Sequence, residues 1–158
     1  MKQFSMARRA TLLLSVALLT ACASGVKLDD VDGKGGTDYS SQPWNDPKSP
    51  LFKRSVYFDF DSYAVKAEYQ ATLQAHANYL KANKDRKIKI EGNTDERGTT
   101  EYNLALGQRR SEAVRKSLSL LGVPDSQMEA VSFGKEKPKA QGSNEAAWQE
   151  NRRADIAY

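Results

Sequence analysis

The sequence predicts an α+β domain over residues 51–158, and three observations support this. Four short segments alternate apolar and polar residues, as strands with one buried face do. Two longer segments repeat apolar residues every three to four positions, as amphipathic helices do. The order β-α-β-α-β-(α)-β predicts a two-layer sandwich, in which helices cover one face of a mixed four-stranded sheet.

The first predicted strand covers residues 55–60, where Val56, Phe58 and Phe60 form one apolar face. The spacing of the next segment predicts a helix over about 65–82. Its apolar face comprises Tyr69, Leu73, Ala77 and Leu80. His76 lies beside this face without a partner motif for a base or a metal ligand, so we expect a structural histidine, packed or half exposed.

The remaining elements follow the same two periods. A strand is predicted over 86–92, and a helix over about 100–121 that ends at Gly122 and Pro124. The last three elements are a strand over 128–134, a short helix within 143–153 capped by Ser143 or Asn144, and a strand over 154–158 with Ala154, Ile156 and Tyr158 on one side.

Arg110 is the residue that this pattern leaves unexplained. At about 100° per residue it points into the middle of a mostly apolar helical arc. The arc comprises Leu106, Ala113, Val114, Ser117, Leu118 and Leu121. Burying a guanidinium without a partner costs several kcal/mol. We therefore expect Arg110 to reach the helix edge, to pair with an internal acid or to meet a ligand.

Asp95 supplies an opposite charge in the loop 92–98, which leads into the same helix. Taken alone, a loop aspartate usually satisfies nearby backbone donors. Together with Arg110 it offers an anion and a guanidinium fork, which complement the ammonium and carboxylate of an amino-acid zwitterion. The pair predicts a binding site rather than a catalytic one.

Residues 1–21 have the features of an export signal. Three basic residues and no acid precede the apolar segment 10–21, which is too short to span a bilayer. The segment leads into LTAC, which resembles the lipobox of bacterial lipoproteins, so we expect lipidation of Cys22. Three acyl chains would anchor the protein to a membrane, and Ala23 favours the outer membrane by the sorting rule known for enteric bacteria.

Residues 22–50 are predicted to be the lipidated cysteine and a flexible tether. They are rich in Gly and Pro, and their apolar residues follow neither a helical nor a strand periodicity. A coil of this length spans about 30 Å. Trp44 is its unusual residue, and docking on the domain, docking on a partner and simple exposure are all open for it.

Composition argues against several classes of function. The chain has 24 Lys and Arg against 20 Asp and Glu, but the predicted signal carries three of the basic residues and none of the acids. The mature chain is therefore nearly neutral, and we expect no nucleic-acid binding. No Ser-His-Asp or Cys-His catalytic set is expected, because the only cysteine is the predicted lipidation site and the only histidine is His76 on the helix face. DFDS at 59–62 lacks the other ligands and the glycine of a calcium loop. We expect no enzyme activity, no metal and no cofactor.

Four segments together resemble the OmpA-like peptidoglycan-binding domain family: VYFDFDS, EGNTDERGTTEYNLALGQRR, VSFGKEKP and NRRADIAY. In that family Thr-Asp is followed by Leu, Arg, Val and Leu at fixed spacings. The pattern is met by Thr94, Asp95, Leu106, Arg110, Val114 and Leu118. Small departures are Gly107 and Ser111, where the family often has Ser and Ala, and Asn93, where many members have His.

The resemblance implies that Asp95 holds the ammonium of meso-diaminopimelate in the peptidoglycan stem peptide, and that Arg110 holds its carboxylate. Asp61, Thr94 and Asn103 are implied to line the pocket. Arg110→Ala and Asp95→Ala are each expected to abolish wall binding while the domain stays folded. Arg152 and Arg153 are left out of the predicted site, because cations at a helix end are stabilised by the helix dipole.

The resemblance also implies a place in the cell. The protein is expected at the outer membrane, lipid-anchored with its domain facing the periplasm, where it tethers the membrane to peptidoglycan. Its implied partners are the β-propeller protein of the Tol system (TolB) and the Tol inner-membrane components, with a role in envelope integrity and cell division. Two alternatives are open: an OmpA-like lipoprotein outside the Tol system, and a wall hydrolase that uses Asp61 and Asp95.

Overall fold

The computed structural model describes residues 42–158. The predicted signal peptide, Cys22 and the tether as far as residue 41 lie outside the described residues. The sheet consists of β1 (Ser55–Tyr57), β2 (Ile88–Asn93), β3 (Met128–Gly134) and β4 (Arg153–Ala157). Its order is β1-β4-β2-β3, in which β2 and β3 are parallel and β4 is antiparallel to both of its neighbours.

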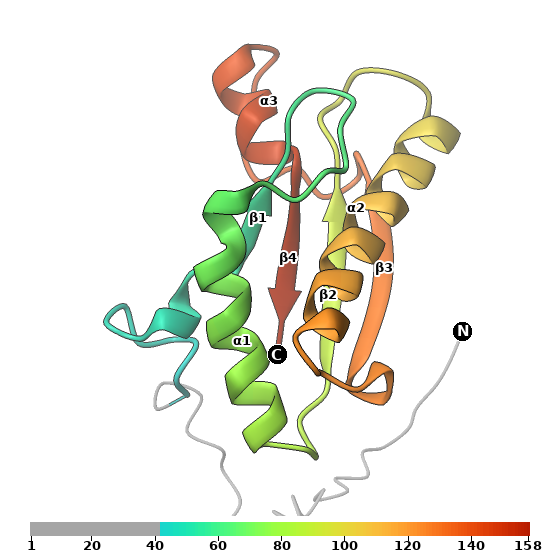
Figure 1. Ribbon diagram of the computed structural model, residues 1–158. Coiled ribbons are helices and arrows are strands. Elements are labelled where there is room, and N and C mark those ends of the chain that lie inside the picture. Colours follow the sequence, from blue (N-terminus) through green and yellow to red (C-terminus); the bar gives the residue numbers. More distant parts are fainter. Residues whose placement is uncertain (1–41) are drawn as a thin grey trace, which may run out of the picture. The chain divides into compact units, whose positions relative to one another are not determined.

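Two long helices, α1 (Gln70–Ala82) and α2 (Thr100–Leu120), cover one face of the sheet (Figure 1). The short helix α3 (Glu145–Asn151) leads into the start of β4. This arrangement confirms the predicted α+β fold, with a mixed four-stranded sheet and helices on one face. No helix among residues 42–158 combines the length and apolar character needed to cross a bilayer.

Local sequence explains where α2 and α3 begin and end. The Thr99 side chain accepts a hydrogen bond from the Tyr102 backbone, and Asn144 does the same for Ala147, so both helices have a side-chain N-cap. Gly122 follows the end of α2 at a φ of 90°, which a residue with a side chain rarely adopts.

The first strand is shorter than predicted, and Phe60 does not belong to the core. The chain leaves the sheet after Tyr57 and turns, with Asp61 at a left-handed φ of 52°. Phe58 stays fully buried, whereas Phe60 is 62% exposed. The prediction of a strand as far as residue 60 was therefore wrong, because a turn interrupts the alternation.

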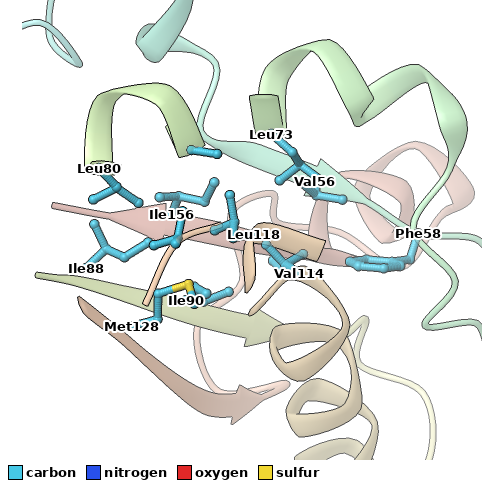
Figure 2. Packing of buried hydrophobic residues seen from close by; sticks show 13 residues of the cluster. Val56, Phe58, Leu73, Leu80, Ile88, Ile90, Val114, Leu118, Met128 and Ile156 are labelled. Carbon is cyan, nitrogen blue, oxygen red and sulfur yellow. The ribbon is translucent and has the colours of Figure 1, made fainter. Parts of the chain in front are cut away.

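The hydrophobic core fills the space between the sheet and the two long helices (Figure 2). Ile90 and Ile156 project from the sheet, while Val114 and Leu118 project from α2. Gly92 and Gly107 set the separation between β2 and α2, since a Cβ on Gly92 would lie only 1.8 Å from the Gly107 carbonyl oxygen. This close approach places the next turn of α2, which carries Arg110, against the end of β2.

Trp44 docks on the domain. Its ring stacks on that of Tyr158 with centroids 4.3 Å apart, and the Arg86 guanidinium lies 5.0 Å from its centroid. Its exposed fraction is 7%. Packing therefore begins before residue 51, within the predicted tether. Tyr158 follows β4, whose last residue Ala157 pairs with the start of β2, so Trp44 lies at the end of the sheet where β2 begins.

Trp44→Ala is expected to lower the free energy of unfolding by about 3 kcal/mol, because it removes a buried aromatic ring from this stack. Urea denaturation measures the change. Trp44→Phe serves as the control and should lose less than half as much, since a smaller ring can still stack. A loss below about 0.5 kcal/mol for Trp44→Ala would contradict the packing.

His76 is fully buried and structural, as expected from the sequence. Its Nε2 lies 2.9 Å from the Lys53 carbonyl oxygen and its Nδ1 lies 2.6 Å from the Tyr158 hydroxyl. A carbonyl only accepts, so Nε2–H donates to it and the neutral ring accepts from the hydroxyl at Nδ1. Burial lowers the pKa of His76, and the bond to Lys53 offsets this only in part.

This lowered pKa predicts a loss of stability in mild acid. Well above pH 6.5 the ring is neutral in the folded and unfolded chains. Below it the unfolded chain binds a proton that the folded chain excludes, so the free energy of unfolding should fall by up to about 1.4 kcal/mol per pH unit. Denaturation of His76→Gln between pH 7 and 5 is the comparison, and equal slopes for both proteins would rule the effect out.

Candidate functional site

A cavity of ≈ 200 Å³ lies between the loop that follows β1, the loop that follows β2 and the first turns of α2. The structure brings all five residues of the predicted site to its wall: Asp61, Thr94, Asp95, Asn103 and Arg110. Four further side chains that were not part of the predicted site also line it: Phe60, Arg97, Tyr102 and Leu106.

Arg110 is fully buried, and its partners are backbone carbonyls rather than an acid. Nε donates to Ser62 at 2.8 Å, Nη1 to Asn93 at 2.9 Å and Nη2 to Asp59 at 3.1 Å. Burial lowers the pKa of Arg110 to about 10, while nearby Asp95 favours its charge, so the side chain is cationic at neutral pH. These bonds use three of its five N–H groups, which leaves one on each terminal nitrogen without a hydrogen bond to residues 42–158.

Asp95 is also buried, and it already has two cationic partners. Arg97 donates to it from Nε and Nη2, with an Nη2–Oδ2 distance of 2.6 Å, and from its backbone N–H. The Nη1 group of Arg152 lies 3.4 Å from the same Oδ2. Burial raises the pKa of Asp95, but the hydrogen bonds from Arg97 outweigh burial and hold the pKa below its usual value.

Arg152, which the prediction left outside the site, contacts the buried Asp95 but does not itself line the cavity. Arg153 lies apart from the cavity and pairs with Asp155 along β4. This difference between the two arginines was hardly predictable from the sequence. Ala154 pairs with Gly92, so Arg152 falls beside the loop that carries Asp95, but the pairing register of β4 with β2 must be known first.

The other predicted residues shape the wall of the cavity. Asp61 is exposed and accepts a hydrogen bond from the Tyr102 hydroxyl, and it has no cationic partner in the described part of the chain. The backbone N–H of Thr94 donates to Gly134, and the Asn103 amide donates to the Arg97 carbonyl at 2.8 Å. Thr94 and Asn103 thus hold the loop, while Asp61 presents a carboxylate whose hydrogen bond comes from a neutral hydroxyl.

This set of groups suits binding better than hydrolysis. A carboxyl that acts as a general acid needs a raised pKa, but the pKa of Asp95 is lowered and two arginines hold its charge. Within residues 42–158 no three His, Cys, Asp or Glu side chains are grouped so that they could hold a metal ion. The arrangement offers fixed charges of both signs to a zwitterionic ligand.

Comparison with known proteins shows which family has this fold and these cavity residues. The model of the OmpA family matches residues 57–152, which include every residue that lines the cavity. The peptidoglycan-associated lipoprotein of Pasteurella multocida is 48% identical over 144 residues, which cover 91% of this chain and 92% of that protein. The chain belongs to the OmpA family. The resemblance seen in the sequence is thereby confirmed.

Two further matches and one shared fold extend the likeness. The peptidoglycan-associated lipoprotein of Haemophilus influenzae is 45% identical over 152 residues, with 91% of this chain and 92% of that protein covered. A crystal structure of the peptidoglycan-associated lipoprotein from Burkholderia pseudomallei is 70% identical, covers 74% of this chain and 99% of that one, and has a TM-score of 0.72. The C-terminal domain of Helicobacter pylori MotB, at 23% identity and a TM-score of 0.60, shares the fold; the match covers 65% of this chain and 81% of that one.

Proposed function

We propose that this protein binds peptidoglycan non-covalently and has no catalytic role. The observation that carries the proposal is the state of Arg110, a buried cation at the cavity wall that has two unused N–H groups and no acidic partner among residues 42–158. The names of its relatives, peptidoglycan-associated lipoproteins, support the same class of ligand.

The ligand group that fits is meso-diaminopimelate of the stem peptide. Its carboxylate would accept the two free N–H groups of Arg110, and its ammonium would be neutralised by Asp95, with Asp61 as a second acid at the rim. Charge-assisted hydrogen bonds contribute about 1.5 to 3 kcal/mol each, so a micromolar affinity for one stem peptide is reasonable. Many anchors on one wall would then add avidity.

The location that we propose is the outer membrane, with acyl chains on Cys22 and the domain in the periplasm. In that position the protein would tie the membrane to the wall as a component of the Tol system, which supports envelope integrity and division. TolB and the Tol inner-membrane components are the proposed partners. Co-purification of TolB with the full chain tests this part, and its absence would favour an OmpA-like lipoprotein outside the Tol system.

Sedimentation with purified cell walls tests the ligand. The full chain should pellet with walls that contain meso-diaminopimelate and remain in solution with walls that contain lysine, because lysine lacks the side-chain carboxylate that Arg110 would bind. Equal pelleting with both walls would remove diaminopimelate as the recognised group. Release of soluble wall fragments during the incubation would instead support a hydrolase and overturn the binding-only proposal.

A further inference from the structure

The two cations that hold Asp95 differ in how firmly they are placed. Arg152 has a side chain that is 3% exposed, and it also donates to the Phe58 carbonyl, to Glu145 and to Gln149. If the Arg152 side chain moved away from Asp95, its other three hydrogen bonds in this buried position would be disrupted as well. Arg152 is therefore a fixed part of the wall.

Arg97 is the more accessible partner. Its side chain is 33% exposed and lines the cavity, and its side-chain hydrogen bonds all go to Asp95. The guanidinium carbon lies 4.2 Å from the ring centroid of Phe60 and 4.0 Å from that of Trp148. Arg97 therefore occupies the side of Asp95 that faces the cavity, which is where a ligand ammonium would bind.

We infer that Arg97 is a displaceable counter-ion, which holds the ammonium subsite on Asp95 until a cationic ligand group replaces it. This inference rests on the proposed function. The two aromatic rings favour this exchange, because they can still stabilise the guanidinium after it leaves the carboxylate. Arg97 then determines specificity, since a neutral or anionic group cannot take its place on a buried carboxylate.

The first test is the affinity of the full chain for a soluble stem peptide that ends in meso-diaminopimelate, measured by calorimetry. Arg97→Gln removes the competing cation, so its affinity should rise at least five-fold. Arg109→Gln is the matched control, because Arg109 is an exposed arginine of α2 that contacts Tyr63 rather than Asp95, and its affinity should change less than two-fold. Thermal unfolding first verifies that each variant is folded.

The results separate the inference from the proposed function. Binding by the parent chain together with weaker or unchanged binding by Arg97→Gln would overturn the inference and leave the proposed function standing. Absence of binding by the parent chain and by Arg97→Gln would remove the proposed function, and the inference with it.

A second test reports the displacement directly. The chain has two tryptophans, so the variant Trp44→Phe leaves Trp148 as the only one. Its emission should change when the peptide binds, because Arg97 shifts relative to the Trp148 ring. The double variant Trp44→Phe, Arg97→Gln should bind the peptide with less than one fifth of that change. A saturating peptide that leaves the Trp148 emission of Trp44→Phe unaltered would also overturn the inference.

Discussion

Arg110→Met is expected to destabilise the domain by about 4 kcal/mol and to abolish wall binding. The substitution leaves the carbonyls of Ser62, Asn93 and Asp59 without their donor, and each buried polar group that loses its partner costs about 1 to 3 kcal/mol. Urea denaturation and wall sedimentation measure the two effects. The sequence had led us to expect that a change at Arg110 leaves the fold intact, and its three carbonyl partners revise that expectation.

The neighbouring residue provides the control. Arg109→Met removes the same charge one position earlier on α2, where the side chain is exposed. It should change stability by less than about 0.5 kcal/mol and should leave wall binding unaffected. A folded Arg110→Met protein of parental stability that still pellets with the wall would exclude Arg110 from both roles.

Asp95→Asn is expected to abolish wall binding and to lower stability by about 3 kcal/mol. The amide is similar in size, but it removes the anion between Arg97 and the buried Arg152, and breaking one side of a buried ion pair is costly. Binding is compared by sedimentation at a temperature where circular dichroism shows the variant folded. The control is Asp155→Asn, which breaks the ion pair with Arg153 on the face of the sheet away from the helices and should lose stability without losing binding.

The pH dependence of Asp95→Asn gives an independent measurement. Because the pKa of Asp95 is lowered in the folded chain, its contribution to stability is complete above the usual pKa of 3.8 and is lost as the pH falls through the lower folded value. The parent chain should therefore lose stability below pH 4 more steeply than Asp95→Asn. If the free energy of unfolding fell equally steeply below pH 4 in both proteins, the Asp95 carboxylate would not form the stabilising ion pairs described here.

Much of the fold could be predicted from the periodicity of apolar residues, and particular residues show where such prediction fails. The strand over 128–134 was located correctly because apolar alternation and flanking turns agree there. The end of β1 was missed, since Phe60 continues the alternation of Val56 and Phe58 although the backbone has already turned. Alternation depends on side-chain polarity alone and carries no information about a left-handed residue such as Asp61.

The candidate site was likewise predictable only in part. Helical spacing alone was enough to identify Arg110 as unusual, because the charge and the apolar arc around it belong to the same sequence segment. Its carbonyl partners were not predictable, since they come from the loop that follows β1 and from the last residue of β2. The contacts of Arg97 with Phe60 and Trp148 likewise join three distant segments. Pairs within one segment could be found from the sequence, whereas those that depend on strand register could not.

The position of Trp44 has a mechanical consequence. The chain enters the domain where β2 begins, and the cavity lies where β2 ends, about 20 Å away along a strand of this length. Tension between the N-terminal segment and a ligand in the cavity would thus run parallel to the strands. The ladder hydrogen bonds would bear this load in shear, all together, instead of opening one after another like a zipper.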